Sequence, residues 1–181
     1  MVGDSLSAEY GLARGSGWIE LLRQRLQERG GVRTVINASI SGDTSAGGRS
    51  RLDALLKRHA PSLVVIELGG NDALRGLDLT ASRANLRDMI SRAQASGSKE
   101  LLLGMKVPPN YGRAYGEAFE RMYLELARET SVALVPFFLE AIADRLDYFQ
   151  PDRIHPNESA QKLMLDAVWP ALEKLLEGRP R

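Results

Sequence analysis

Cysteine is absent from the 181 residues of the chain, which excludes disulfide bonds, thiolate nucleophiles and cysteine-ligated zinc. A dominant charge is also lacking, because 24 Lys and Arg residues stand against 23 Asp and Glu residues and the charges are scattered. No basic tract is present, so the sequence predicts no nucleic-acid partner.

Long hydrophobic runs are missing as well. The longest apolar stretches, residues 63–68 and 132–139, are far shorter than the ~20 residues of a membrane span, so we expect no transmembrane segment. Met1 leads straight into Val2-Gly3-Asp4-Ser5, and no signal peptide is present in the sequence. A mature form whose leader had been removed would look the same.

What the chain does contain is a regular alternation of apolar, β-branched runs and longer stretches of helical period. Apolar residues make up 44% of the chain and charged residues 26%, a composition typical of globular proteins, and the length fits one domain over residues 1–181. The patterns predict strands at residues 32–38, 63–68, 100–105 and 131–135, and helices at residues 17–29, 48–59, 80–95, 115–129 and 158–176.

Strands that alternate with helices form right-handed βαβ units, and therefore a mostly parallel sheet covered on both faces. In such sheets a ligand binds at the carboxyl ends of the strands. The polar blocks of this sequence follow the predicted strands, whereas the loops after the helices hold only turn-forming residues. These blocks are Gly-Asp-Ser-Leu at residues 3–6, the Ser/Thr-rich residues 39–45, Gly-Gly-Asn-Asp at residues 69–72, residues 108–112 and residues 152–156.

The chain has only two histidines. His59 ends a predicted helix beside Lys57 and Arg58, where a cation stabilises the helix carbonyls, and we interpret it as structural. His155 stands in a loop, one turn after Asp152. A carboxylate at this spacing can accept a hydrogen bond from one imidazole nitrogen and leave the other free to act as a base.

Each block also has a plainer interpretation. The residues around Asp152 and His155 could form a turn before a helix, and Gly-Asp-Ser alone is more often a turn than a nucleophile. Gly69 and Gly70 could serve a tight turn, and Gly42 could mark a helix start. The conjunction of these blocks at strand ends favours a catalytic site.

Taken together, these residues resemble the GDSL or SGNH hydrolases, and within them the bacterial thioesterase I, arylesterase and lysophospholipase L1 group. Further stretches carry the same resemblance, among them IELGGNDALRG, PPNYG and ALVPFFLE. The four blocks of that family are matched by Ser5, Gly42, Asn71 and His155.

The resemblance implies Ser5 as the nucleophile, His155 as the general base and acid, and Asp152 as the residue that orients it. It implies an oxyanion hole made by the backbone amides of Ser5 and Gly42 and the side chain of Asn71. Acyl chains would run past residues 74–77 and 108–111. The substrate-binding residues expected there are Leu74, Pro108, Pro109, Asn110 and Tyr111.

The resemblance further implies an α/β fold, a flavodoxin-like three-layer sandwich with a five-stranded, mostly parallel sheet. The expected substrates are small-molecule acyl esters and thioesters, including aryl esters, acyl-CoA and lysophospholipids, with no metal or organic cofactor. It favours the periplasm and leaves the cytoplasm open. Two alternatives remain at this point: a carbohydrate acetylesterase, and a non-catalytic flavodoxin-like domain whose loops would bind the phosphate of FMN.

One departure concerns the first strand. Relatives have a full apolar strand before the Gly-Asp-Ser-Leu block, whereas only Met1 and Val2 precede it here. We therefore expect the first strand to be truncated, with ~4–6 apolar residues, and a secretion signal before them, standing upstream in the native protein.

Overall fold

The computed structural model describes residues 1–30 and 34–177. Its sheet is parallel and has the order β1-β2-β3-β4. The strands are β1 (Val2–Gly3), β2 (Leu63–Glu67), β3 (Lys99–Leu103) and β4 (Ala133–Val135).

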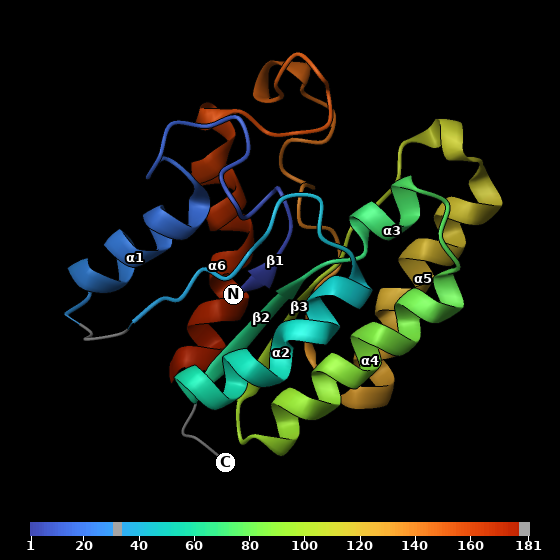
Figure 1. Ribbon diagram of the computed structural model, residues 1–181. Helices are drawn as coiled ribbons and strands as arrows, with labels where there is room; N and C mark the ends of the chain where they lie inside the picture. The colour runs from blue at the N-terminus through green and yellow to red at the C-terminus, as the bar shows by residue number, and fades with distance from the viewer. Residues whose placement is uncertain (31–33, 178–181) are drawn as a thin grey trace.

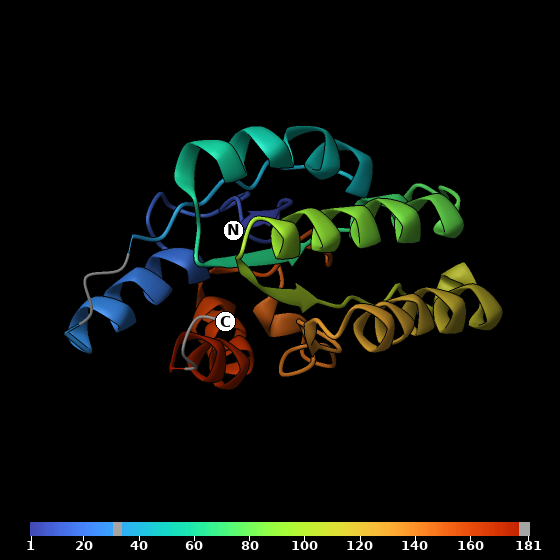
Figure 2. The same ribbon diagram turned by 90° about the horizontal axis from the view of Figure 1, so that it is seen from below.

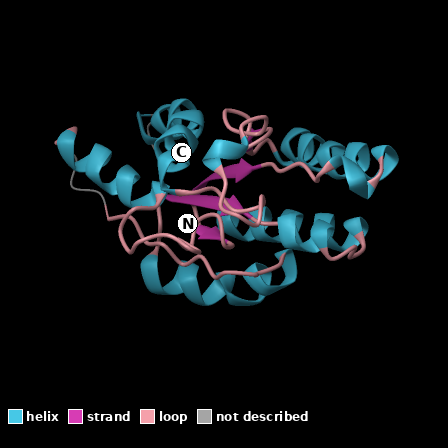
Figure 3. Ribbon diagram, turned by 90° about the horizontal axis from the view of Figure 1, so that it is seen from above, coloured by secondary structure: helices cyan, strands magenta, loops and turns pink. Residues whose placement is uncertain are grey.

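Helices cover both faces of this sheet (Figures 1 and 3). One layer contains α2 (Ser45–His59), α4 (Leu79–Ala95) and α5 (Arg113–Thr130), in which α4 packs between the other two. In the other layer α1 (Trp18–Glu28) packs against α6 (Gln161–Glu177) (Figure 2). The predicted three-layer α/β/α class is confirmed. The described residues contain no helix with the length and apolar character that crossing a membrane requires.

The remaining elements are short. Helix α3 (Gly70–Leu74) begins two residues after β2 ends, in the block for which a tight turn was the plainer interpretation. The 3₁₀ turns are η1 (Pro109–Tyr111), η2 (Leu146–Tyr148) and η3 (Glu158–Ala160).

The predicted count of five strands is wrong, because the described sheet has four. The strand expected over residues 32–38 is not formed in its described part, residues 34–38, and residues 32 and 33 lie outside the described residues. The chain still runs beside β1 here: Ala38 donates its amide to the Met1 carbonyl and Ile40 donates to the Gly3 carbonyl, both at 3.0 Å. Because β1 has only two residues, it offers too few partners for a continuous ladder.

A cavity of about 850 Å³ lies at the amino end of β1, away from the polar loops. Its walls are mostly apolar side chains from α1, α2, the start of β2 and residues 34–38. Among them are Trp18, Leu22, Leu52, Leu63 and Val65.

Candidate active site

Ser5 begins the turn that follows β1. Asp4 shapes this turn, because its side-chain Oδ1 accepts a hydrogen bond from the Leu6 amide at 3.0 Å and its carbonyl accepts one from the Ala8 amide at 3.0 Å. Asp4 itself is buried, whereas Ser5 is only half-buried. The serine hydroxyl is therefore presented at the carboxyl end of the sheet on a fixed backbone.

His155 connects Ser5 to Asp152. The Nε2 atom of His155 lies 2.9 Å from Ser5 Oγ, and its Nδ1 atom lies 2.7 Å from Asp152 Oδ2. The other carboxylate oxygen of Asp152 accepts the amides of Ile154 at 2.9 Å and His155 at 3.0 Å. The structure thus brings the predicted nucleophile, base and orienting carboxylate into one hydrogen-bonded chain.

The ionisation of Asp152 determines the tautomer of the imidazole. Burial acts to raise the pKa of Asp152, but hydrogen bonds from the amides of His155 and Ile154 and from the imidazole outweigh it and lower the pKa to about 2. An ionised carboxylate can only accept hydrogen bonds, so Nδ1 of His155 carries the proton. This leaves Nε2 unprotonated in the neutral ring, ready to accept the proton of Ser5.

Two residues that the sequence reasoning missed hold the His155 loop. Gln150 donates its backbone amide to the His155 carbonyl at 2.7 Å and accepts the Arg153 amide at its own carbonyl at 2.9 Å, and its Nε2 donates to the Tyr10 carbonyl at 2.8 Å. The ring of Tyr10 lies against the imidazole, with centroids 4.4 Å apart. No sequence signal marks this pairing, because Tyr10 and His155 meet only in the folded chain.

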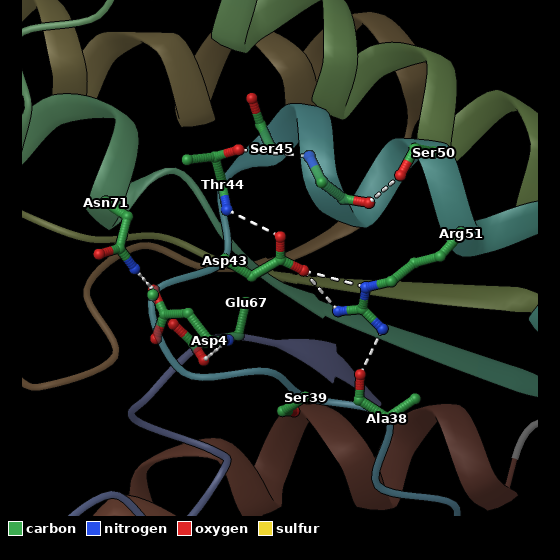
Figure 4. A network of polar contacts seen from close by, with 12 residues as sticks. Asp4, Ala38, Ser39, Asp43, Thr44, Ser45, Ser50, Arg51, Glu67 and Asn71 are labelled. Atoms are coloured by element: carbon green, nitrogen blue, oxygen red, sulfur yellow. Dashed lines mark hydrogen bonds and ion pairs between the residues drawn. The ribbon is translucent and has the colours of Figure 1, made fainter.

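Gly42 lies in the loop before α2 with φ of 77°, in the left-handed region that favours glycine. The loop is held by an ion pair of 2.7 Å between Asp43 and Arg51, and Arg51 also donates to the Ala38 carbonyl (Figure 4). On the other side, Arg75 donates to the Gly42 carbonyl at 2.9 Å. These contacts fix the orientation of the Gly42 peptide.

Asn71 lies in the first turn of α3, and its Nδ2 donates to Asp4 Oδ2 at 2.9 Å (Figure 4). The next residue, Asp72, is buried and ties α3 to two other helices: it accepts the amide of Ser45 at 2.8 Å and the hydroxyl of Ser82 at 2.9 Å. The Gly-Gly-Asn-Asp block is therefore anchored on both sides, by Asp4 next to the nucleophile and by the α2–α4 layer.

The predicted substrate-binding residues are brought together only in part. The Tyr111 hydroxyl donates to the Leu74 carbonyl at 3.0 Å, which places η1 against the end of α3. Pro108, Pro109 and Asn110 are exposed in the loop before Tyr111.

Ser5, His155 and Asp152 form a hydrogen-bonded chain at the carboxyl ends of parallel strands. The Asn71 amide and the constrained Gly42 lie in loops at the same edge. These features define a serine hydrolase of the α/β class. The G-x-S-x-G turn of α/β-hydrolases is absent from the sequence. Residues 1–163 match the GDSL-like Lipase/Acylhydrolase family, and the chain belongs to this family.

Characterised relatives agree with this assignment. The chain is 52% identical to esterase TesA of Pseudomonas aeruginosa over 97% of its own length and 88% of the relative. It is 43% identical to thioesterase 1/protease 1/lysophospholipase L1 of Escherichia coli, over 97% of its own length and 83% of the relative.

A solved structure shares the fold. The psychrotrophic esterase EstA from Pseudoalteromonas, inhibited by monoethylphosphonate, superposes with a TM-score of 0.92 at 39% identity, covering 98% of this chain and 97% of that one. The predicted family and the ester hydrolase class are therefore confirmed.

Proposed function

We propose that the chain hydrolyses acyl esters and thioesters through an acyl-enzyme on Ser5. The observation that supports this most directly is the 2.9 Å contact between Ser5 Oγ and His155 Nε2, with Asp152 on the opposite ring nitrogen. In the first step Nε2 takes the hydroxyl proton as Oγ attacks the acyl carbon. The protonated imidazole then gives this proton to the leaving alcohol or thiol, and water repeats the sequence to release the acid.

The negative oxygen formed in each step would be stabilised by the backbone amides of Ser5 and Gly42 and by Nδ2 of Asn71. Within residues 1–30 and 34–177, neither of these two amides donates a hydrogen bond to a protein acceptor. Asn71 uses Nδ2 to contact Asp4, and an amide nitrogen has two hydrogens, so the second remains for the substrate.

The acyl chain would lie along the end of α3 and the η1 loop, over Leu74, Pro108, Pro109, Asn110 and Tyr111. Two exposed apolar side chains favour this path: Leu77 is 44% exposed and Tyr111 is 36% exposed. The names of the relatives, an esterase and a thioesterase/lysophospholipase, point to small-molecule acyl esters and thioesters as substrates here too.

Two measurements test the proposal. A series of p-nitrophenyl esters and acyl-CoA thioesters of increasing chain length, with Ser5→Ala as the inactive control, should show turnover of both bond types. A preference for acetyl groups alone, extended to acetylated sugars, would favour the carbohydrate acetylesterase. An alkyl phosphonate should add covalently at Ser5, and mass spectrometry that finds the adduct on another residue would contradict the assignment of the nucleophile.

A further inference from the structure

Glu67 is a carboxyl group at the end of an otherwise apolar strand. It is the last residue of β2, pairs in register with Gly3 of β1, and is 0% exposed. Asp4, the next residue after β1, is 3% exposed and lies beside it. Two carboxyl groups thus share one buried site directly behind the nucleophile.

The hydrogen bonds of Glu67 identify its protonation state. Its Oε2 accepts the Asp4 amide at 3.2 Å and the Ser7 hydroxyl at 2.9 Å, and Ser7 Oγ in turn accepts Nε1 of Trp18 at 3.2 Å. Its Oε1 is also buried, yet no described residue donates to it. A buried carboxylate would need hydrogen-bond donors at both oxygens. In Glu67, Oε2 has two donors and fits the carbonyl oxygen of a neutral acid, whereas Oε1 has none and fits the hydroxyl.

The electrostatics agree with this geometry. Burial and the neighbouring charge of Asp4 raise the pKa of Glu67 well above its ordinary value. Burial also raises the pKa of Asp4, but hydrogen bonds from Leu6, Glu67 and Asn71 oppose it. The other titratable groups that face the pair are Tyr123 on α5 and, acting on Asp4, His155. None of them is a permanent cation, so the pair shares one proton, held by Glu67.

The ionised Asp4 then acts on Asn71. Its Oδ2 accepts a hydrogen bond from Nδ2 of Asn71 at 2.9 Å (Figure 4). This bond fixes the orientation of the Asn71 amide, with its nitrogen toward Asp4. Were Asp4 neutral, or displaced by a second negative charge, the amide could turn and present its oxygen to the substrate. An oxygen at that place would repel the developing oxyanion.

We propose that Glu67 is a positioning residue for ester hydrolysis: as a buried neutral acid it donates to Asp4, keeps Asp4 ionised, and thereby holds the Asn71 amide as an oxyanion donor. This inference rests on the oxyanion role proposed above for Asn71. It assigns Glu67 no contact with the substrate.

Infrared difference spectroscopy tests the protonation state without relying on activity. The spectrum of the wild type minus that of Glu67→Gln should contain the C=O stretch of a protonated carboxylic acid at neutral pH. Glu100, a buried carboxyl group on β3, supplies the matched control, and Glu100→Gln should leave this band in place. Absence of the band from the wild type, or its persistence in Glu67→Gln, would overturn the proposal.

Kinetics test the positioning role. Gln is isosteric and can make the same hydrogen bonds, so Glu67→Gln should keep kcat within about threefold of the wild type, whereas Glu67→Ala should lower kcat by about 10²-fold with little change in KM. The double variant Glu67→Ala/Asn71→Ala should be no slower than Asn71→Ala alone. Full additivity of the two effects would overturn the proposal. An Asn71→Ala enzyme with wild-type kcat would instead contradict the oxyanion role on which it rests.

Discussion

Ser5 and His155 are 150 positions apart in the chain, yet Ser5 Oγ and His155 Nε2 lie 2.9 Å from each other. The contact depends on two separate supports: the Asp4 turn behind Ser5, and the loop around Asp152 that presents the imidazole. Because the side chains of Asp4 and Asp152 orient the reacting atoms without containing them, each can be altered while the serine hydroxyl and the imidazole are retained.

Asp152→Asn should reduce kcat by about 10⁴-fold, as expected when an orienting carboxylate is replaced by an amide that favours the wrong imidazole tautomer. The low pKa of Asp152, about 2, means that the wild-type side chain stays ionised throughout the assay range. Asp147, an exposed residue paired with Arg145, offers the matched control, and Asp147→Asn should keep full activity. Comparable losses in both variants would show that general loop damage is the cause.

Asn71→Ala should lower kcat by about 10²- to 10³-fold and change KM little, because the amide acts mainly on charge that develops in the transition state. Steady-state kinetics on one p-nitrophenyl ester, with circular dichroism to verify the fold, provide the measurement. A rise in KM with kcat preserved would mean that Asn71 binds the substrate and its transition state equally.

Tyr10→Ala should reduce kcat by about 2- to 10-fold, while Tyr10→Phe should leave it unchanged. The reason is that the ring packs against the imidazole of His155 at a centroid distance of 4.4 Å, and such a ring contact contributes about 0.5–1.5 kcal/mol. Equal losses in both variants would indicate that the hydroxyl, and not the ring, supports His155.

The sequence predicted the residues of the site better than the contacts that orient them. Ser5, Asp152 and His155 come together as expected, because parallel strands bring their following loops to one edge; their catalytic roles remain predictions. Glu67 carried a signal in the sequence, as a charge within an apolar run, but its pairing with Asp4 depends on the register of β1 against β2. That register follows from tertiary pairing and not from local pattern. The same holds for residues 34–38, which run beside β1 without forming the expected strand.

The buried acid also affects stability. Since the folded-state pKa of Glu67 is raised above its ordinary value of 4.5, its contribution is fully present below about pH 4.5 and is lost as the pH rises through the folded pKa. Glu67→Gln removes this titration. Urea unfolding at several pH values should therefore show the variant gaining stability relative to the wild type as the pH increases. A difference that stays constant with pH would contradict the raised pKa.

The cavity at the amino end of β1 leads to the last prediction. Within the described residues, β1 pairs with β2 only at Ile66 and Glu67, so the β1-side edge of residues 63–65 has no strand partner and borders the cavity of about 850 Å³. The Met1 amine lies at the same place; burial lowers its pKa to about 6, and it donates to the Ile36 carbonyl at 2.9 Å. An extended apolar segment would fit between residues 34–38 and β2.

We therefore propose that four to six β-branched residues, about one strand's length, added ahead of Met1 would extend β1 and pair with β2. They would bury apolar surface in the cavity and replace the buried terminal amine by a peptide group, so the melting temperature should rise by about 5 °C or more. A Gly/Ser extension of equal length is the matched control, because it adds the same chain without the apolar side chains. Equal melting temperatures for the two extended proteins would show that the cavity does not accept a strand. A higher melting temperature and a higher kcat in the apolar extension alone would link the order of β1 to the placement of Ser5.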